Sequence, residues 1–259
     1  MDNNIIDIST FNLFLALLLL FIPAYSLYYF RTGLVRDTFI AAGRMVLQLF
    51  FIGFYLEYLF DWNNVWINIL WVIIMVGVAS YTVLKRTRLP QKRLFLAVCV
   101  AFFFSILILD LYFLGVVVRL EHLFDARYFV PISGMLLGNM LSTNVMALNT
   151  FYSGVEREKQ LFQYLLGNGA TLSEALAPFM REALIKSFNP ALASMSVMGL
   201  IALPGTMTGQ ILGGSSPNVA IKYQITIMVT TFASTLISVL LTLWISRKQS
   251  FDEFGIKQF

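Results

Sequence analysis

The sequence predicts an all-α, polytopic membrane protein of about seven transmembrane helices. First, 58% of its 259 residues are hydrophobic and only 12% are charged, whereas soluble domains usually carry about a quarter charged residues. Second, seven mostly apolar runs have the roughly 17–25 residues that a helix needs to span a bilayer. The runs are 11–30, 38–60, 65–84, 94–118, 128–148, 191–212 and 223–245.

The distribution of lysine and arginine predicts the orientation of these spans, because cytoplasmic connections carry the excess of both residues. Most cations follow the first, third, fifth and seventh runs, and few follow the others. The first set is Arg31, Arg36, Lys85, Arg86, Arg88, Lys92, Arg93, Arg157, Lys159, Arg181, Lys186, Arg247, Lys248 and Lys257. The second set is Arg119, Arg127 and Lys222. We therefore expect the N-terminus outside, the C-terminus in the cytoplasm, and one transmembrane domain over residues 1–259.

The N-terminal segment carries Asp2 and Asp7 and no lysine or arginine before the first run. A cleaved signal peptide starts with positive charge, so we expect the first run to remain as a span in a multi-pass protein of the cell membrane.

The longest connection, about 150–190, predicts a pair of helices on the cytoplasmic side. Gly167 and Gly169 are typical of a helix end, and Thr171 with Glu174 forms a capping-box pattern that starts a new helix. Glu182 and Lys186 form a favourable i,i+4 pair. Pro178 could split this second stretch into two short helices. The pair could pass force from a motor to the spans, or it could be an interfacial segment that only connects two of them.

The sixth run contains the string LPGTMTGQ at 203–210. Pro204 and Gly205 free backbone groups inside an apolar layer, and such groups must find partners or line a cavity. Thr206, Thr208 and Gln210 could supply partners. We expect either a hinge that lines a pathway or close helix packing through small residues.

Polar side chains also occur inside other runs. Arg44 and Gln48 lie one turn apart in the second run, and a charge there needs a partner or water. Asp110 is one candidate partner, and the alternative is that Arg44 snorkels to the boundary. Candidate pathway residues in or next to the fifth run are Asn139, Asn144 and Asn149, although Gly134 and Gly138 nearby favour close helix packing over a pathway.

Methionines near the sixth run offer thioether groups as another kind of candidate ligand. Met195, Met198 and Met207 could present thioethers to a soft metal, although methionine more often fills apolar space. The chain has one cysteine, Cys99, and one histidine, His122. No cluster has metal-ligand spacing, no GxxxxGK[ST] string predicts nucleotide binding, and nothing predicts nucleic-acid binding. We expect no cofactor on this chain and assign no metal ligands.

Several strings together resemble one known family. They are GMLLGN at 134–139, ALN at 147–149, LGNGAT at 166–171, REAL at 181–184 and LPGTMTGQILG at 203–213, with Pro217, Tyr223 and Gln224 in register and Arg44 and Gln48 in the second run. The chain resembles the FetB-type ABC transporter permeases, which include iron-export and metal-resistance subunits and plant aluminium-tolerance proteins.

The resemblance implies a permease that is not itself an enzyme. Two copies would pair and work with a separate cytoplasmic ABC ATPase that holds ATP and Mg²⁺. The resemblance places the ATPase-coupling residues at Gln163, Gly167, Gly169, Ala170, Thr171 and Glu174. From the polar, methionine and Pro-Gly positions in these runs, together with the resemblance, we expect the pathway or hinge at Arg44, Gln48, Asn139, Asn144, Asn149, Met198, Pro204, Gly205, Met207 and Gln210.

Two positions depart from the family pattern. Gln163 stands six residues before the coupling glycine, where an acidic residue is usual, and Thr206 stands at a usual methionine position. The implied function is export of a metal ion such as iron. A nucleotide sugar is an alternative substrate within the family, and a seven-helix receptor or sensor is the alternative from another class.

Overall fold

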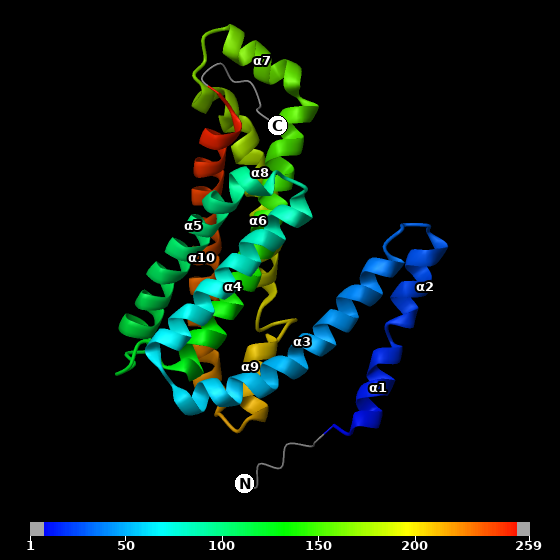
Figure 1. Ribbon diagram of the computed structural model, residues 1–259, viewed down its shortest axis with the longest axis vertical. Helices are drawn as coiled ribbons and strands as arrows, with labels where there is room; N and C mark the ends of the chain where they lie inside the picture. Colours follow the sequence, from blue (N-terminus) through cyan, green and yellow to red (C-terminus); the bar gives the residue numbers. More distant parts are fainter. Residues whose placement is uncertain (1–7, 253–259) are drawn as a thin grey trace. The chain divides into compact units, whose positions relative to one another are not determined.

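The computed structural model describes residues 8–252 and contains two units (Figure 1). One comprises the chain up to Trp62 together with Leu212–Gly214, and the other comprises Asn63–Ile211 and the chain from Ser215 onward. The tail cation Lys257 and the N-terminal Asp2 and Asp7 lie outside the described residues.

The first unit contains three helices. These are α1 (Thr10–Leu18), α2 (Phe21–Tyr29) and α3 (Val35–Trp62). Ser9 caps α1 by accepting a hydrogen bond from the Asn12 amide. Together, α1 and α2 form a mostly apolar stretch of 20 residues, and α3 is 28 residues long, so each stretch is long enough to cross a bilayer. Arg44 and Gln48 lie on α3.

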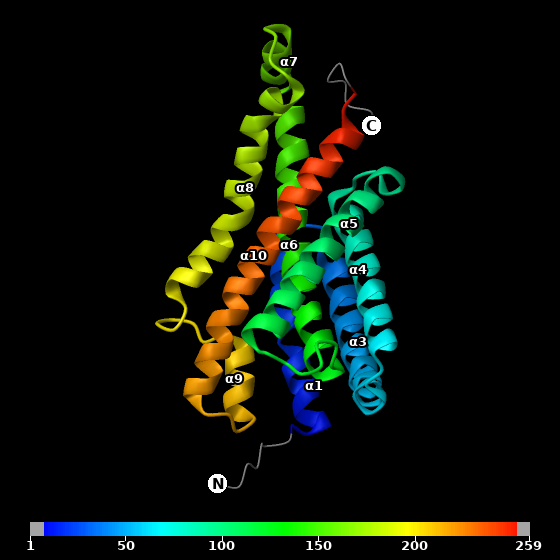
Figure 2. The ribbon, with the colours of Figure 1, turned by 90° about the vertical axis from the view of Figure 1, so that its left-hand side faces the viewer.

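The second unit is a bundle around one central helix, α6 (Ala126–Arg157). Neighbouring α6 are α4 (Val65–Thr87), α5 (Gln91–Asp110), α8 (Leu172–Val197) and α10 (Pro217–Ser250), and α10 also packs on α5 (Figure 2). The short α7 (Lys159–Gly167) caps one end of the bundle, and α9 (Gly205–Leu212) lies near the other. The core contains fully buried Phe102, Phe151, Phe179, Leu136 and Met140.

Five stretches of the described chain are long and apolar enough to cross a membrane, and they match five of the seven predicted runs. The fifth run lies on α6, and its polar residues lower its mean hydropathy. These polar residues face a cavity and neighbouring helices. The sixth run is interrupted between α8 and α9. The all-α, polytopic fold is confirmed, while the count of seven and the orientation stay predictions.

The predicted connection at 150–190 is mostly continuous helix. The α6 helix extends to Arg157, and α8 runs unbroken through Pro178 and Pro190 into the sixth run. The expected split at Pro178 is therefore wrong. A proline inside a helix costs about 3 kcal/mol. Burial of Leu176 and Phe179 against the bundle outweighs that cost, because each large apolar side chain contributes roughly 1.5–3 kcal/mol.

The break in the sixth run falls earlier than Pro204. The α8 helix ends at Val197, and Gly199 adopts φ +85° in a tight turn where its N–H donates to the Ala202 carbonyl at 3.0 Å. Gly205 then begins α9, and the Thr208 amide bonds the Pro204 carbonyl. Pro204 therefore precedes a helix, where its missing N–H costs nothing.

Candidate functional site

A cavity of about 600 Å³ lies among α6, α8, α10 and the start of α9. Its lining is polar and neutral. Hydroxyl groups come from Ser142, Thr143, Ser187, Ser194, Thr206, Thr231 and Thr235, and amides come from Asn139 and Gln224. Among the described residues, no charged side chain lines it. A hard cation without its hydration water would find no carboxylate ligand in this cavity, but it would find neutral hydroxyl and amide oxygens.

Four methionines also line this cavity. Met135 and Met146 come from α6, Met195 from α8 and Met228 from α10. Thioether sulfur is a soft, polarisable donor. The cavity therefore combines hydroxyl, amide and thioether groups within the helix bundle.

One hydrogen bond lies at the end of this cavity near α9. The Thr206 hydroxyl donates to Gln224 Oε1 at 2.5 Å, and Gln224 is 6% exposed. This contact ties the first turn of α9 to α10. Thr206, at the position where the family pattern has methionine, therefore serves as a polar link between two helices.

The structure brings only part of the predicted pathway together. Asn139, Pro204 and Gly205 line the cavity. Asn144 instead donates to the Ser238 hydroxyl at 2.9 Å and is fully buried between α6 and α10. Asn149 lies at the rim of a separate surface pocket beside Arg88 and Tyr152.

The other predicted pathway residues lie outside the cavity lining. Met198 forms the turn after α8, and Met207 and Gln210 lie on α9. Arg44 and Gln48 belong to the first unit, so a pairing of Arg44 with Asp110 stays a prediction. Asp110 itself accepts a 2.5 Å hydrogen bond from the Ser133 hydroxyl. Gly134 packs closely on Met75 of α4, as the small-residue pattern indicates.

Sequence reasoning missed three of the cavity methionines, Met135, Met146 and Met228. Each lies within an apolar run, where methionine is usually filler. Only the spacing of 11 residues between Met135 and Met146, which is close to three helical turns, places those two on one face. No signal within the sequence pairs that face with α8 and α10.

The second candidate feature is the hairpin made by α7 and the start of α8, residues 158–182, hereafter the α7–α8 hairpin. Gly169 has φ +88°, and its N–H donates to the Leu166 carbonyl while the Ala170 N–H donates to the Leu165 carbonyl. Helices commonly end with such a left-handed glycine. The Thr171 hydroxyl and the Glu174 carboxylate then form the predicted capping box. The glycine stop and the new helix start are confirmed.

Aromatic packing holds the α7–α8 hairpin against the bundle. Phe162 of α7 is 4% exposed and contacts the rings of Phe179 on α8 and Phe251 after α10, with centroids 6.3 and 5.7 Å away. Phe251 also contacts Phe151 of α6. Movement of α7 would therefore be transmitted to three helices of the bundle.

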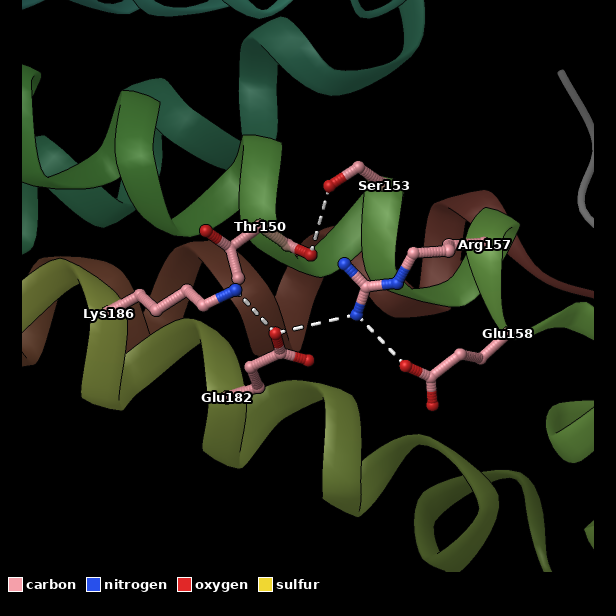
Figure 3. A network of polar contacts seen from close by, with 6 residues as sticks. All are labelled: Thr150, Ser153, Arg157, Glu158, Glu182 and Lys186. Atoms are coloured by element: carbon pink, nitrogen blue, oxygen red, sulfur yellow. Dashed lines mark hydrogen bonds and ion pairs between the residues drawn. The ribbon is translucent and has the colours of Figure 1, made fainter.

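An ionic network adds a second link between α6 and α8 (Figure 3). Glu182 Oε1 accepts from Lys186 Nζ at 2.6 Å and lies 3.6 Å from Arg157 Nη2, which also contacts Glu158 at 2.9 Å. These contacts, led by the Lys186 hydrogen bond, lower the pKa of the Glu182 carboxyl. The predicted Glu182–Lys186 pair is confirmed, although exposed pairs contribute little to stability.

The outer face of α7 is exposed. Gln163, Gly167 and Gly169 are open, and the large side chains Leu161 and Tyr164 are 42% and 67% exposed. A projecting helix with exposed apolar side chains is suited to contact another protein. The predicted coupling residues Gln163, Gly167 and Gly169 are therefore accessible at this end of the bundle, while their role in coupling stays a prediction.

The apolar helices and the neutral-lined cavity define a multi-pass helical membrane protein. Residues 10–251 match a family described as "Uncharacterised protein family (UPF0014)". The chain belongs to this family of membrane proteins.

Relatives span bacteria and plants. The UPF0014 membrane protein YjkA of Bacillus subtilis (strain 168) is 34% identical over 79% of this chain and 80% of its own length. Protein ALUMINUM SENSITIVE 3 of Arabidopsis thaliana is 35% identical over 73% of this chain and 67% of its own. The "Probable iron export permease protein FetB" of Escherichia coli (strain K12) is 27% identical over 95% of this chain and 93% of its own. No solved structure matches.

Proposed function

We propose that this chain is the membrane-spanning permease subunit of an ABC transporter and that it exports a metal ion such as iron. The similarity to the relative named as a probable iron export permease carries this proposal, because it extends over nearly the whole of both chains. ATP and Mg²⁺ bind to a separate ATPase subunit, and two permease chains pair around the pathway.

The α7–α8 hairpin supports the coupling part of the proposal. Its exposed Gln163 and Tyr164 offer a contact for the ATPase, while its buried Phe162 is packed against α8 and the end of α10. A push on α7 therefore reaches α8 and α10, and both helices line the cavity. In this mechanism, closure of the two ATPase subunits moves these helices and exposes the cavity to the other side.

The cavity supports the transport part of the proposal. A volume of about 600 Å³ holds an ion with part of its hydration shell, and the hydroxyl and amide lining can replace lost water. The irregular backbone at 198–204 ends at Pro204, which lines this cavity. Irregular backbone inside a membrane is tolerated where it lines a cavity.

The direct test of assembly is co-purification with a candidate ABC ATPase from the same organism. We expect a stable complex in lipid nanodiscs that the double variant Leu161→Asp, Tyr164→Asp abolishes, because it places two charges on the exposed face of α7. The matched control is Leu70→Asn with Leu96→Asn, exposed apolar positions on α4 and α5. Absence of any complex with the wild-type chain would contradict the proposal and favour the receptor alternative.

A further inference from the structure

We propose that Met135, Met195 and Met228, with the Thr231 hydroxyl, form a binding site for a soft or borderline transition-metal ion inside the cavity. This inference rests on the proposed transport function and names the donor groups and the class of substrate. The site lies entirely within the second unit, between α6, α8 and α10.

The helix register places Met135 and Met228 at the same height. Asn144 of α6 bonds Ser238 of α10, and the Tyr152–Ser250 contact further along shows that the two helices run in the same direction. Met135 precedes Asn144 by nine residues, and Met228 precedes Ser238 by ten. At about 1.5 Å per residue, the backbones of both residues lie roughly 13–15 Å along their helices from that contact, and both residues line the same cavity.

A second contact places Met195 near the same height. Phe188 of α8 packs on Phe232 of α10 with ring centroids 5.5 Å apart. Met195 follows Phe188 by seven residues, which is close to two turns, and Met228 precedes Phe232 by four. Each methionine therefore shares a helix face with its phenylalanine, and the two lie within roughly 5 Å of each other along the bundle.

Thr231 supplies an oxygen beside these thioethers. It lies three residues after Met228, on the same face of α10, and it lines the cavity. Its Oγ1 is shielded from solvent and has no hydrogen-bond partner among the residues that the structure describes. A buried hydroxyl without a partner is costly, and a bound cation would satisfy the oxygen.

The donor set determines which ions bind. Thioethers favour soft ions such as Cu(I), whereas Mg²⁺ and Ca²⁺ need carboxylate and other hard oxygen ligands. No charged side chain lines the cavity, and the described residues contain no group of three or more His, Cys, Asp or Glu that could hold a metal. The site therefore prefers Cu(I) and its analogue Ag(I), accepts Fe(II) more weakly, and rejects Mg²⁺, Ca²⁺ and Al³⁺.

Silver binding to the purified full-length chain tests this site. The background variant is Cys99→Ser, because the thiol of the single cysteine would itself bind silver. We expect one Ag(I) per chain, competed by Fe(II) under anaerobic conditions and not by Mg²⁺. The triple variant Met135→Leu, Met195→Leu, Met228→Leu should bind Ag(I) at least tenfold more weakly, while Met180→Leu, elsewhere on α8, should bind as the background does.

Equal silver affinity in the triple variant, or equal competition by Mg²⁺, would overturn the proposal. X-ray absorption at the silver edge provides a second measurement that needs no triple variant. Sulfur neighbours around the ion in the Cys99→Ser chain support the site, and only oxygen or nitrogen neighbours overturn it. Association with the ATPase is independent of this binding, so loss of silver binding alone would leave the permease proposal standing.

Discussion

Replacement of Gly169 by alanine should loosen the α7–α8 hairpin through the backbone alone. Gly169 has φ +88°, and a Cβ added there would meet no atom within 4 Å. No clash is therefore expected, and the whole cost comes from holding an L-residue in a left-handed conformation, about 1–2 kcal/mol. Such a cost raises the population of the open hairpin about 5–30-fold.

Hydrogen exchange of the amides in residues 159–171 measures this opening. The Gly169 and Ala170 N–H groups, which bond Leu166 and Leu165, should exchange faster in Gly169→Ala by that factor. Gly169→Asn should show a smaller effect, because asparagine tolerates the left-handed region better than alanine does. Gly77→Ala is the control, since Gly77 lies within α4 and also faces open space.

The relative increase in amide exchange in Gly169→Ala and Gly169→Asn distinguishes a backbone cause from a steric cause. If size were the cause, asparagine would disturb the hairpin more than alanine. Unchanged exchange in Gly169→Ala, or a larger effect in Gly169→Asn, would refute the assignment of Gly169 as the conformational stop of α7.

Three further predictions concern the start of α8 and the contact between α5 and α6. Thr171→Ala removes the side-chain cap of α8 and should destabilise its first turn by about 1 kcal/mol, measured by hydrogen exchange. The Thr171 hydrogen bonds lower the pKa of the Glu174 carboxyl, so their contribution to folding stability is present above the ordinary glutamate pKa and is lost as the pH falls through the lower folded value. The free energy of unfolding measured against pH should show this loss, and Glu174→Gln should remove this pH dependence. Ser133→Ala leaves Asp110 without its hydrogen bond and should lower stability in detergent by about 1–3 kcal/mol, whereas Ser105→Ala, whose hydroxyl bonds only the Ala101 carbonyl of its own helix, should cost less.

The features that depend on local chemistry could be predicted from the sequence. The apolar runs, the glycine stop at Gly169, the Thr171–Glu174 capping box and the Glu182–Lys186 pair each involve residues within one span or one turn. Such features are decided by length, backbone conformation and neighbours three or four positions apart, so the structure reproduces five of the seven runs and all three of the local motifs.

Features that depend on packing between distant segments were not predictable. Pro178 did not end its helix, because the surrounding side chains bury themselves against α6. The Asn144 amide bonds Ser238, 94 positions away, and so does not face the cavity. The cavity methionines could not be grouped, because their proximity follows from the register of three helices that no pattern in the sequence specifies.

The central claim is that ATP hydrolysis by a partner drives a metal ion through this chain. The direct measurement is ATP-dependent uptake of radioactive iron into liposomes that hold this chain and its ABC ATPase, with the ATPase facing outward. We predict uptake that needs ATP and Mg²⁺ and falls in Gly169→Ala but not in Gly77→Ala. ATP hydrolysis without any metal movement would contradict iron export, and no hydrolysis above that of the ATPase alone would contradict coupling itself.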